Sequence, residues 1–345
     1  MYKCAFLGCG GRARGHAQAY QHVKGGEIVA ICDMSEDLLN SFGDDFKIEK
    51  RYTDIHQMLD RECPDLLHIV TAPILRSTGE PIRHSLMSIA SEHEVPAAIV
   101  EKPIAVQSEG WRDLMDLCQN TQTKFVVNTQ LNFHPRNLEL KRNVNNGQIG
   151  DIKFIDASAR STPLDQGPHV LQLVSSYIDN SQPVKVFGQV SGGDHLGGAQ
   201  PSPGNAAASV MYENGVRASV AFGTEGAAKI NDSDSVFHHK RVAIFGTRGF
   251  THWQMAGWER STPEGGYESG LHSYGEQDLL GQAGLTEAVF AWLDDEAQVH
   301  PTHLAQSLAE FNLLMGIYAS ALRHEPIQLP FDPPDGLMDS LKGIL

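Results

Sequence analysis

The sequence has neither a basic tract nor a long apolar run. Its 345 residues carry 42 acidic side chains against 27 basic ones, which gives a formal net charge of −15 at pH 7. Proteins that hold nucleic acid by its phosphates carry a basic patch, so this charge balance argues against a nucleic-acid partner. A membrane-spanning helix needs about 20 consecutive apolar residues, and no run approaches that length. We therefore expect no nucleic-acid partner and no membrane contact.

Cysteine is scarce and confined to the first 118 residues of the chain. No C-x-x-C pair occurs among the five cysteines, which are Cys4, Cys9, Cys32, Cys63 and Cys118. Reduced cytosolic thiols are expected. Apart from His169, which is discussed below, the histidines show no metal-ligand spacing, so no metal site is predicted. These histidines, His16 among them, are interpreted as surface or packing residues. The first apolar run begins at Lys3 and leaves no room for a cleaved signal peptide, so we expect a cytoplasmic protein.

What the sequence does contain is a glycine-rich turn close to its start. The apolar run Lys3–Leu7 meets the turn Gly8–Ala13 (G-C-G-G-R-A). A predicted helix of about residues 15–23 follows, and a second apolar run, Ile28–Cys32, ends on Asp33. This order of strand, tight turn, helix, strand and acid is typical of a dinucleotide-binding unit. The alternative is a glycine turn in an ordinary α/β protein.

Each residue of the turn has a physical role in that interpretation. Gly8 permits the tight turn, Gly10 lets a pyrophosphate approach the backbone, and Ala13 lets the helix pack close to the strand. Gly11 and Arg12 stand at the helix N-terminus, whose N–H groups and partial positive charge attract phosphate. These residues are predicted to bind the cofactor.

Asp33 indicates which dinucleotide binds. Its carboxylate can accept hydrogen bonds from both hydroxyls of the adenine ribose, and it repels a 2′-phosphate. No arginine or lysine follows it within three residues, so NAD is favoured over NADP. Arg12 and Arg14 leave NADP open, because either could reach a phosphate; alternatively, both are solvated residues of the helix start.

Two further strands end in residues suited to a catalytic edge. The run Leu66–Val70 leads into Thr71-Ala72-Pro73, and Ala97–Val100 leads into Glu101-Lys102-Pro103. Ligands of parallel sheets bind at the carboxyl ends of the strands. Lys102 could hydrogen-bond a substrate hydroxyl or carbonyl at that edge. The alternative is an ordinary surface lysine.

The periodicity predicts an α/β fold with two domains. Strands and helices alternate over residues 1–128, which indicates an NAD-binding Rossmann domain with a doubly wound parallel sheet. Beyond residue 150, strand-like runs follow one another without helices, and Asn214-Gly215 is typical of a hairpin turn. We expect residues 129–345 to form a substrate-binding α/β domain with a mostly antiparallel sheet, from which a helix at 302–323 could return to the first domain. Residues 257–284 are predicted to be a long, glycine-rich loop.

A second candidate site lies in this C-terminal part. In Asp165-Gln166-Gly167-Pro168-His169, an acid and a histidine stand four residues apart at the start of a predicted helix. This spacing places both on one helical face if the turn is already helical, and an acid beside an imidazole holds its tautomer. The alternative is a helix start with a hydrogen-bonded, structural histidine.

Four motifs together resemble the glucose–fructose oxidoreductase / inositol dehydrogenase (Gfo/Idh/MocA) family. They are G-C-G-G-R-A at 8–13, T-A-P at 71–73, E-K-P at 101–103 and D-Q-G-P-H at 165–169, and the stretch 317–330 resembles the family's closing helix and strand. The resemblance runs in order over nearly the whole chain. It implies a Rossmann domain and an α/β domain whose large open sheet often forms the interface of a homo-oligomer, here a dimer or tetramer.

The resemblance also implies roles for single residues. The residues that act at the reacting carbon would be Lys102, Asp165 and His169. The cofactor site would be lined by Thr71, Pro73 and Glu101. Gln130 stands where an asparagine of the family often contacts the nicotinamide.

Several positions depart from the family's pattern. Gln172 replaces a second acid after the histidine, and Asn132 stands where an arginine commonly precedes an aromatic residue. The loop 74–83 looks longer than usual, which could displace His84. These changes indicate an unusual substrate pocket and no loss of NAD. The candidate substrate contacts are Asn132, His134 and Arg160, although each is equally well explained as a surface residue.

Three functions are compatible with these residues. The first is an NAD-dependent dehydrogenase acting on a sugar, a sugar derivative or a cyclitol, with proton transfer by Lys102, His169 and Asp165. Whether Lys102 or His169 accepts the proton stays open. The second is redox-neutral cleavage of a glycoside by oxidation, elimination and return of the hydride. The third, a non-catalytic NAD-sensing regulator, is disfavoured because a sensor has no need of these three residues.

Overall fold

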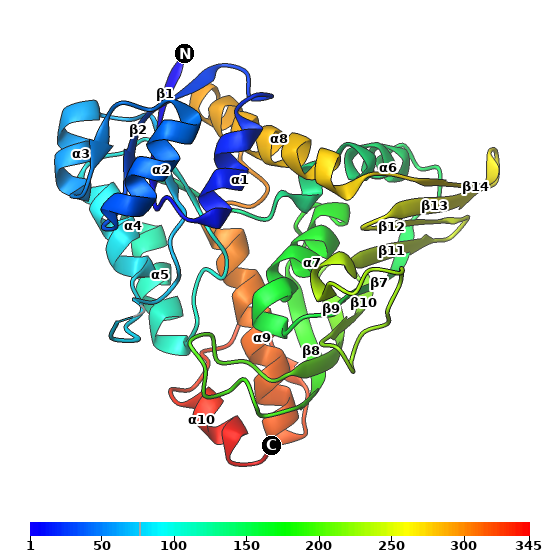
Figure 1. Cartoon of the computed structure of the whole chain (residues 1–345). Helices are drawn as coiled ribbons and strands as arrows, with labels where there is room; N and C mark the ends of the chain where they lie inside the picture. Colours follow the sequence, from blue (N-terminus) through cyan, green and yellow to red (C-terminus); the bar gives the residue numbers. More distant parts are fainter. Residues whose placement is uncertain (76) are drawn as a thin grey trace. The chain divides into compact units, whose positions relative to one another are not determined.

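A computed structural model of the chain describes residues 1–75 and 77–345; Figure 1 shows its helices and strands coloured along the sequence. The chain divides into two compact units. The first comprises Met1–Ala105, Arg112–Phe133 and Asp278–Ala305. The second comprises Val106–Trp111, His134–Gln277 and Gln306–Leu345.

The first unit is built on a six-stranded parallel sheet in the order β3-β2-β1-β4-β5-β6. Its strands are β1 (Tyr2–Leu7), β2 (Gly26–Cys32), β3 (Arg51–Tyr52), β4 (Leu66–Ile69), β5 (Ala97–Val100) and β6 (Lys124–Val127). The alternating helices are α1 (Gly11–Ala19), α2 (Glu36–Phe46), α3 (Ile55–Glu62), α4 (Arg83–Glu92) and α5 (Ser108–Asn120). The strand order reverses between β1 and β4, where such sheets bind their ligands. The predicted Rossmann topology is confirmed.

Local signals in the sequence start several of these elements. Ser35 Oγ accepts from the Leu38 N–H at 3.4 Å and caps α2. Asp54 Oδ1 accepts from the N–H groups of His56 and Gln57 at 2.8 and 3.2 Å and caps α3. Such side chains satisfy N–H groups that have no partner within the helix. Strands β4 and β5 are buried along their whole length, as parallel strands covered on both faces are.

The segment Asp278–Ala305 completes the first unit from far along the chain. Helix α8 (Tyr274–Asp294) adds three side chains to a core cluster of β1, β4, β5 and β6, namely Leu285, Val289 and Phe290. Thr302 Oγ1 donates to the carbonyl of Val127, at the end of β6, at 2.8 Å. The core of this unit therefore depends on residues beyond 277.

The second unit is built on a nine-stranded sheet in the order β14-β13-β12-β11-β7-β10-β9-β8-β15. Its strands are β7 (Ile152–Ala159), β8 (Pro183–Ser191), β9 (Asn205–Tyr212), β10 (Arg217–Phe222), β11 (Arg241–Gly246), β12 (Phe250–Gln254), β13 (Gly257–Thr262), β14 (Gly266–Leu271) and β15 (Ile327–Gln328). Strands β7 and β10 are parallel, and the other neighbours are antiparallel. The predicted, mostly antiparallel sheet is confirmed.

The remaining elements are helical. They are α6 (Pro135–Asn145), α7 (Pro163–Tyr177), α9 (Leu304–Arg323), α10 (Leu337–Lys342) and the 3-10 turns η1 (Gln130–Phe133) and η2 (Val236–His238). Helix α7 packs on β7, β10 and β11. Because α7 already begins at Pro163, the acid and the histidine of the D-x-x-x-H motif both lie inside its first two turns. No helix among residues 1–75 and 77–345 is long and apolar enough to cross a membrane.

The prediction of a long loop at 257–284 is wrong. The stretch contains β13, β14 and the first half of α8. Its glycines serve close packing: a Cβ on Gly270 would lie 2.6 Å from Trp258 Nε1, and one on Gly257 would lie 2.7 Å from the Gly270 carbonyl oxygen. The Asn214-Gly215 turn is confirmed, because β9 and β10 pair antiparallel on either side of it. The predicted loop 74–83 includes residue 76, which lies outside the described residues.

Candidate active site

The glycine-rich turn has the geometry that a pyrophosphate requires. Gly8 adopts φ +98°, and a Cβ there would lie 2.5 Å from the Val70 carbonyl oxygen and 3.4 Å from Thr71 Cγ2. Gly10 and Gly11 differ, because a Cβ on either would have no described atom within 4 Å. The turn is therefore closed on the side of the sheet and open over the start of α1, where the helix N-terminus offers N–H groups to an anion.

Asp33 follows directly after β2 and is held by the backbone. Its Oδ2 accepts from the Cys9 N–H at 2.7 Å, and its Oδ1 accepts from the Ser35 N–H at 2.8 Å. Both bonds fix the carboxylate beside the glycine-rich turn. An acid in this place suits the two hydroxyls of an adenine ribose and repels a 2′-phosphate, so the residues present fit NAD.

Glu101, at the end of β5, accepts hydrogen bonds from three side chains at this edge of the sheet. Its Oε1 accepts from Arg12 Nε at 3.2 Å, from His16 Nε2 at 2.8 Å and from Asn128 Nδ2 at 2.6 Å. Burial raises the pKa of the Glu101 carboxyl, but Arg12, His16 and Lys102 lower it more, and it lies well below its usual range. Glu101 is therefore an ionised carboxylate. Arg12 and Glu101, which are both predicted cofactor residues, are in contact with each other.

The turn after β4 rests on a buried arginine. Arg83 Nη2 lies 3.3 Å from the Thr71 carbonyl oxygen, and its Nη1 lies 3.5 Å from Thr71 Oγ1. Arg83 is 2% exposed, and burial lowers its pKa to about 10, so the guanidinium is still charged at neutral pH. Pro73 is buried, and its carbonyl accepts from the Ile82 N–H at 3.0 Å. The Thr71-Ala72-Pro73 turn is thereby fixed at the sheet edge.

Two further predicted residues of the first unit lie in η1. Gln130 is buried, and its Nε2 donates to Asp278 Oδ1 at 2.7 Å, so its amide is engaged by the returning segment. Asn132 is 3% exposed and is not a surface residue. Lys102 follows Glu101 at the edge of the sheet and is half-buried.

In the second unit, α7 presents Asp165 and His169 one helical turn apart. Asp165 Oδ2 accepts from Ser161 Oγ at 2.7 Å, and its Oδ1 accepts from Gln166 Nε2 at 3.2 Å. Gln166 Oε1 in turn accepts from the ammonium group of Lys240 at 3.0 Å. These bonds hold the carboxylate of Asp165 in place, and both Asp165 and His169 have further interactions.

The other candidate contacts of the second unit are held differently. His134 is fully buried, with its ring 5.6 Å from that of Trp253 and 5.3 Å from that of Tyr274, centroid to centroid. Arg160 Nη2 donates to the Thr224 carbonyl at 2.8 Å. Gln172, which departs from the family's pattern, is fully buried, and its side-chain amide has no hydrogen-bond partner in the part of the chain that the structure describes.

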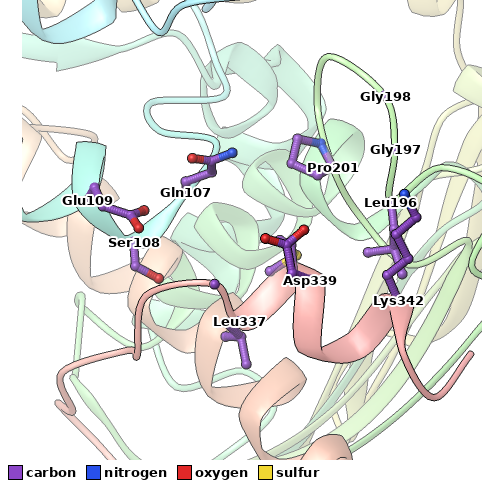
Figure 2. Close-up of a pocket in the computed structure, with 12 residues that line it drawn as sticks. Gln107, Ser108, Glu109, Leu196, Gly197, Gly198, Pro201, Leu337, Asp339 and Lys342 are labelled. Atoms are coloured by element: carbon purple, nitrogen blue, oxygen red, sulfur yellow. The ribbon is translucent and has the colours of Figure 1, made fainter.

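A cavity of about 330 Å³ lies elsewhere in the second unit. Figure 2 shows the side chains of Glu109, Asp339 and Lys342 around it. None of the predicted site residues lines this cavity, and its charged side chains are exposed. It therefore does not coincide with the predicted chemistry. Among residues 1–75 and 77–345, no cluster of three metal-ligating side chains was found.

Sequence reasoning missed several residues that hold the predicted ones. In the first unit they are His16, His68, Arg83 and Asn128, and in the second they are Gln166 and Lys240. A usable signal existed for His68, because a polar residue inside the apolar run LLHIV must find a partner when buried. Lys240 follows a long irregular segment, so nothing in the sequence relates it to α7.

Most of the first unit matches the model of a known family. The Gfo/Idh/MocA model, described as an oxidoreductase family with an NAD-binding Rossmann fold, matches residues 2–129. A D-apiose dehydrogenase of Paraburkholderia graminis is 32% identical over 160 residues, which are 46% of this chain and 40% of the relative. An alpha-N-acetylgalactosaminidase of Shewanella oneidensis is 24% identical over 172 residues, 46% of this chain and 35% of the relative. The chain matches these curated relatives over less than half of their length.

Solved structures resemble the chain over nearly all of its length. An oxidoreductase of Agrobacterium radiobacter, solved with NAD+, L-tartaric acid and magnesium, has a TM-score of 0.77 at 22% identity and covers 95% of this chain and 98% of its own. A levoglucosan dehydrogenase, solved with NADH and levoglucosan, has a TM-score of 0.77 at 14% identity and covers 96% and 99%. These likenesses show the fold, and the family match confirms NAD as the cofactor of the Rossmann unit.

Proposed function

We propose that this chain, which belongs to the Gfo/Idh/MocA family of oxidoreductases, is an NAD-dependent dehydrogenase of CH–OH groups. One observation carries the proposal. The family's NAD-binding model matches residues 2–129, and within them Gly8, Gly10 and Asp33 have the conformation, open space and fixed carboxylate that the dinucleotide needs. When bound, NAD supplies the acceptor for a hydride from the substrate carbon.

The proposed role of the protein's own residues is proton transfer. His169, with Asp165 one turn before it on α7, would take the proton of the hydroxyl that is oxidised. Lys102 would hydrogen-bond the same oxygen and stabilise its developing negative charge. Positioned acid–base groups of this kind contribute about 10²–10⁴-fold in rate. Either Lys102 or His169 could be the final proton acceptor.

The proposed substrate is a sugar, a sugar derivative or a cyclitol. Support comes from the relatives: one is a D-apiose dehydrogenase, and one structural neighbour was solved with levoglucosan. Another neighbour was solved with the hydroxy acid L-tartaric acid. All three molecules offer a secondary or hemiacetal hydroxyl next to further hydroxyls, which suits a site with several hydrogen-bonding side chains. Asn132, His134 and Arg160 are proposed to contact the substrate.

A second candidate is redox-neutral cleavage of a glycoside, with NAD oxidising a hydroxyl and then returning the hydride. It is favoured by a specific observation: the curated relatives include an alpha-N-acetylgalactosaminidase and several glycosyl hydrolase family 109 proteins. The same residues would serve both reactions, because each begins by removing a hydroxyl proton.

One screen tests both candidates. The protein is incubated with NAD+ and hexoses, amino sugars, uronic acids, inositols or aryl glycosides, and NADH and released aglycone are followed together. NADH formation that is proportional to substrate oxidised supports the dehydrogenase. Aglycone release without net NADH supports glycoside cleavage. A protein that binds neither NAD+ nor NADH would contradict both.

We also propose that the protein is a homo-oligomer that associates through the nine-stranded sheet. Four large apolar side chains are exposed on its strands, at 37–47% of their surface: Phe154, Phe187, Met211 and Phe245. Phe245 on β11 pairs with Phe154 on β7. Successive side chains of a strand point to opposite faces, and the registers of β7, β10, β9 and β8 place Met211 and Phe187 on the same face as these two rings. Exposed apolar surface of this extent on a sheet indicates a partner, and a second copy supplies the same face.

A further inference from the structure

A chain of four polar side chains crosses the interior of the first unit. Tyr20 Oη lies 2.8 Å from His68 Nε2, His68 Nδ1 lies 3.3 Å from His16 Nδ1, and His16 Nε2 lies 2.8 Å from Glu101 Oε1. His16 is 1% exposed and His68 is 0% exposed. Groups buried this deeply destabilise the fold unless they are hydrogen-bonded, so the order of donors and acceptors along the chain matters.

The charge on Glu101 determines every hydrogen along this chain. An ionised carboxylate only accepts, so His16 Nε2 must carry a hydrogen. Burial lowers the pKa of both histidines, so each ring is neutral and has one N–H. His16 Nδ1 must then accept from His68 Nδ1, and His68 Nε2 must accept from the hydroxyl of Tyr20. One tautomer of each ring satisfies all three bonds.

Asn128 fits the same assignment. Its Nδ2 lies 2.6 Å from Glu101 Oε1 and 2.9 Å from His16 Nε2. The first distance is a hydrogen bond to the carboxylate. The second separates two donors that share one acceptor, because His16 Nε2 already carries its hydrogen. Glu101 Oε1 is therefore held by three donors, from Arg12, His16 and Asn128.

At the end of this hydrogen-bonded series that is remote from Glu101, the His68 ring is held by packing. The His68 ring stacks on Phe6, with centroids 4.3 Å apart and planes 8° from parallel. His68 belongs to β4, in the middle of the sheet, whereas His16 belongs to α1. The sheet thus sets the orientation of the His68 ring, and His68 supports the tautomer of His16 that Glu101 requires.

We propose that His68 and Tyr20 are positioning residues of the NAD site, which act through His16 on Glu101. By donating to His16 Nδ1, His68 directs the single hydrogen of His16 to Nε2 and so toward the carboxylate. Loss of that donor would let His16 turn its hydrogen away and release one of the three bonds to Glu101. The inference rests on the proposed role of Glu101 in NAD binding and needs no knowledge of the substrate.

Amide replacements separate this role from packing. The side-chain nitrogen of asparagine takes the place of histidine Nδ1, and that of glutamine takes the place of Nε2. His68→Asn therefore keeps the donor to His16, and His68→Gln loses it. For His16 the order reverses, because His16→Gln keeps the donor to Glu101 and His16→Asn loses it.

The measurement is the Kd of NADH, obtained by fluorescence titration of the purified protein. We expect the Kd to rise about tenfold or more for His68→Gln and His16→Asn, and to change less than about threefold for His68→Asn and His16→Gln. A packing role predicts another pattern, in which the effect follows the size of the side chain and the two glutamine variants agree with each other.

His300→Asn is the matched control. His300 is also buried in the first unit, and its ring bonds to the Leu285 carbonyl and the Thr302 N–H but not to Glu101. It should lower the melting temperature and leave the Kd of NADH unchanged. Equal affinities of all folded variants, or the size-dependent pattern, would overturn the inference; where one histidine's variants do not fold, the other pair carries the test. A wild-type protein that does not bind NADH would overturn the proposed function with it.

Discussion

Glu101 is a buried carboxylate that three side chains of the first unit hold in place. Its carboxylate accepts from Arg12, His16 and Asn128, and it neighbours Lys102 in the chain. A buried carboxylate needs such partners, because removing a single one leaves a charge that is poorly compensated. Changes at any of the three donors should therefore be felt at the edge of the sheet where the nicotinamide is expected.

A second buried acid is held in the opposite state. Glu310 on α9 is 5% exposed, and burial raises its pKa to about 8, although Gln306 and Ser175 lower it. The folded protein therefore keeps this carboxyl protonated at pH 7, whereas the unfolded chain ionises it near its ordinary value of 4.5. The associated stability is fully present below about pH 4.5 and is lost as the pH rises to about 8.

Glu310→Gln should remove this loss, because the amide is neutral at every pH. We expect the melting temperature of the wild-type protein to fall more between pH 5 and pH 8 than that of the variant, as followed by circular dichroism. Parallel curves for the two proteins would show that Glu310 is ionised in the folded state.

Among single residues, the sequence points to those proposed to contact the cofactor, but not to the residues that hold them in place. Gly8 and Asp33 are recognisable because a tight turn and the proposed ribose contact each restrict the residue type. His16 has no recognisable role in the sequence alone, because its partner Glu101 lies 85 positions away along the chain. Long-range pairs of this kind depend on how strands and helices pack, which one sequence does not reveal.

Strands β13 and β14 show how element prediction failed. Their glycines predict a loop from the sequence alone, whereas Gly270 is small because Trp258 lies opposite it on the neighbouring strand. Elements with local signals fared better: Ser35 and Asp54 each cap a helix, and Asn214-Gly215 joins two paired strands. Where the cause of a residue type lies on another strand, periodicity alone misassigns it.

The proposed interface on the exposed face of the nine-stranded sheet can be tested with a single substitution. If that face joins two copies, Phe245→Lys should place a charge in the interface and lower the molar mass measured by light scattering to that of one chain. Phe245 is a suitable position because its ring lies 6.1 Å from Phe154 and 6.0 Å from Phe250, centroid to centroid.

Met34→Lys is the control for this experiment. Met34 is 80% exposed and belongs to the first unit, so it is not part of the nine-stranded sheet. It should leave the molar mass unchanged. A wild-type protein of single-chain mass, or a Phe245→Lys protein that stays assembled, would contradict the proposed interface.

For the whole molecule, the fold class was predictable from the sequence. Which segments of the chain belong to each of the two units was harder to predict. Alternating strands and helices up to residue 128 sufficed for the Rossmann topology, because parallel sheets require crossover helices. The segment Asp278–Ala305 gives no local sign that its side chains pack on β1, β4, β5 and β6. An apolar helix predicts that it is buried, but not against which sheet.

We propose that Lys102 and His169 act together on the proton of the substrate hydroxyl in an NAD-dependent oxidation. The most direct measurement is the initial rate of NADH formation by the wild-type protein, Lys102→Ala and His169→Ala, on the best substrate from the screen, with NADH affinity measured in parallel. We expect each substitution to lower the rate by about 10²-fold or more while NADH still binds. Rates near that of the wild-type protein in both variants would contradict it.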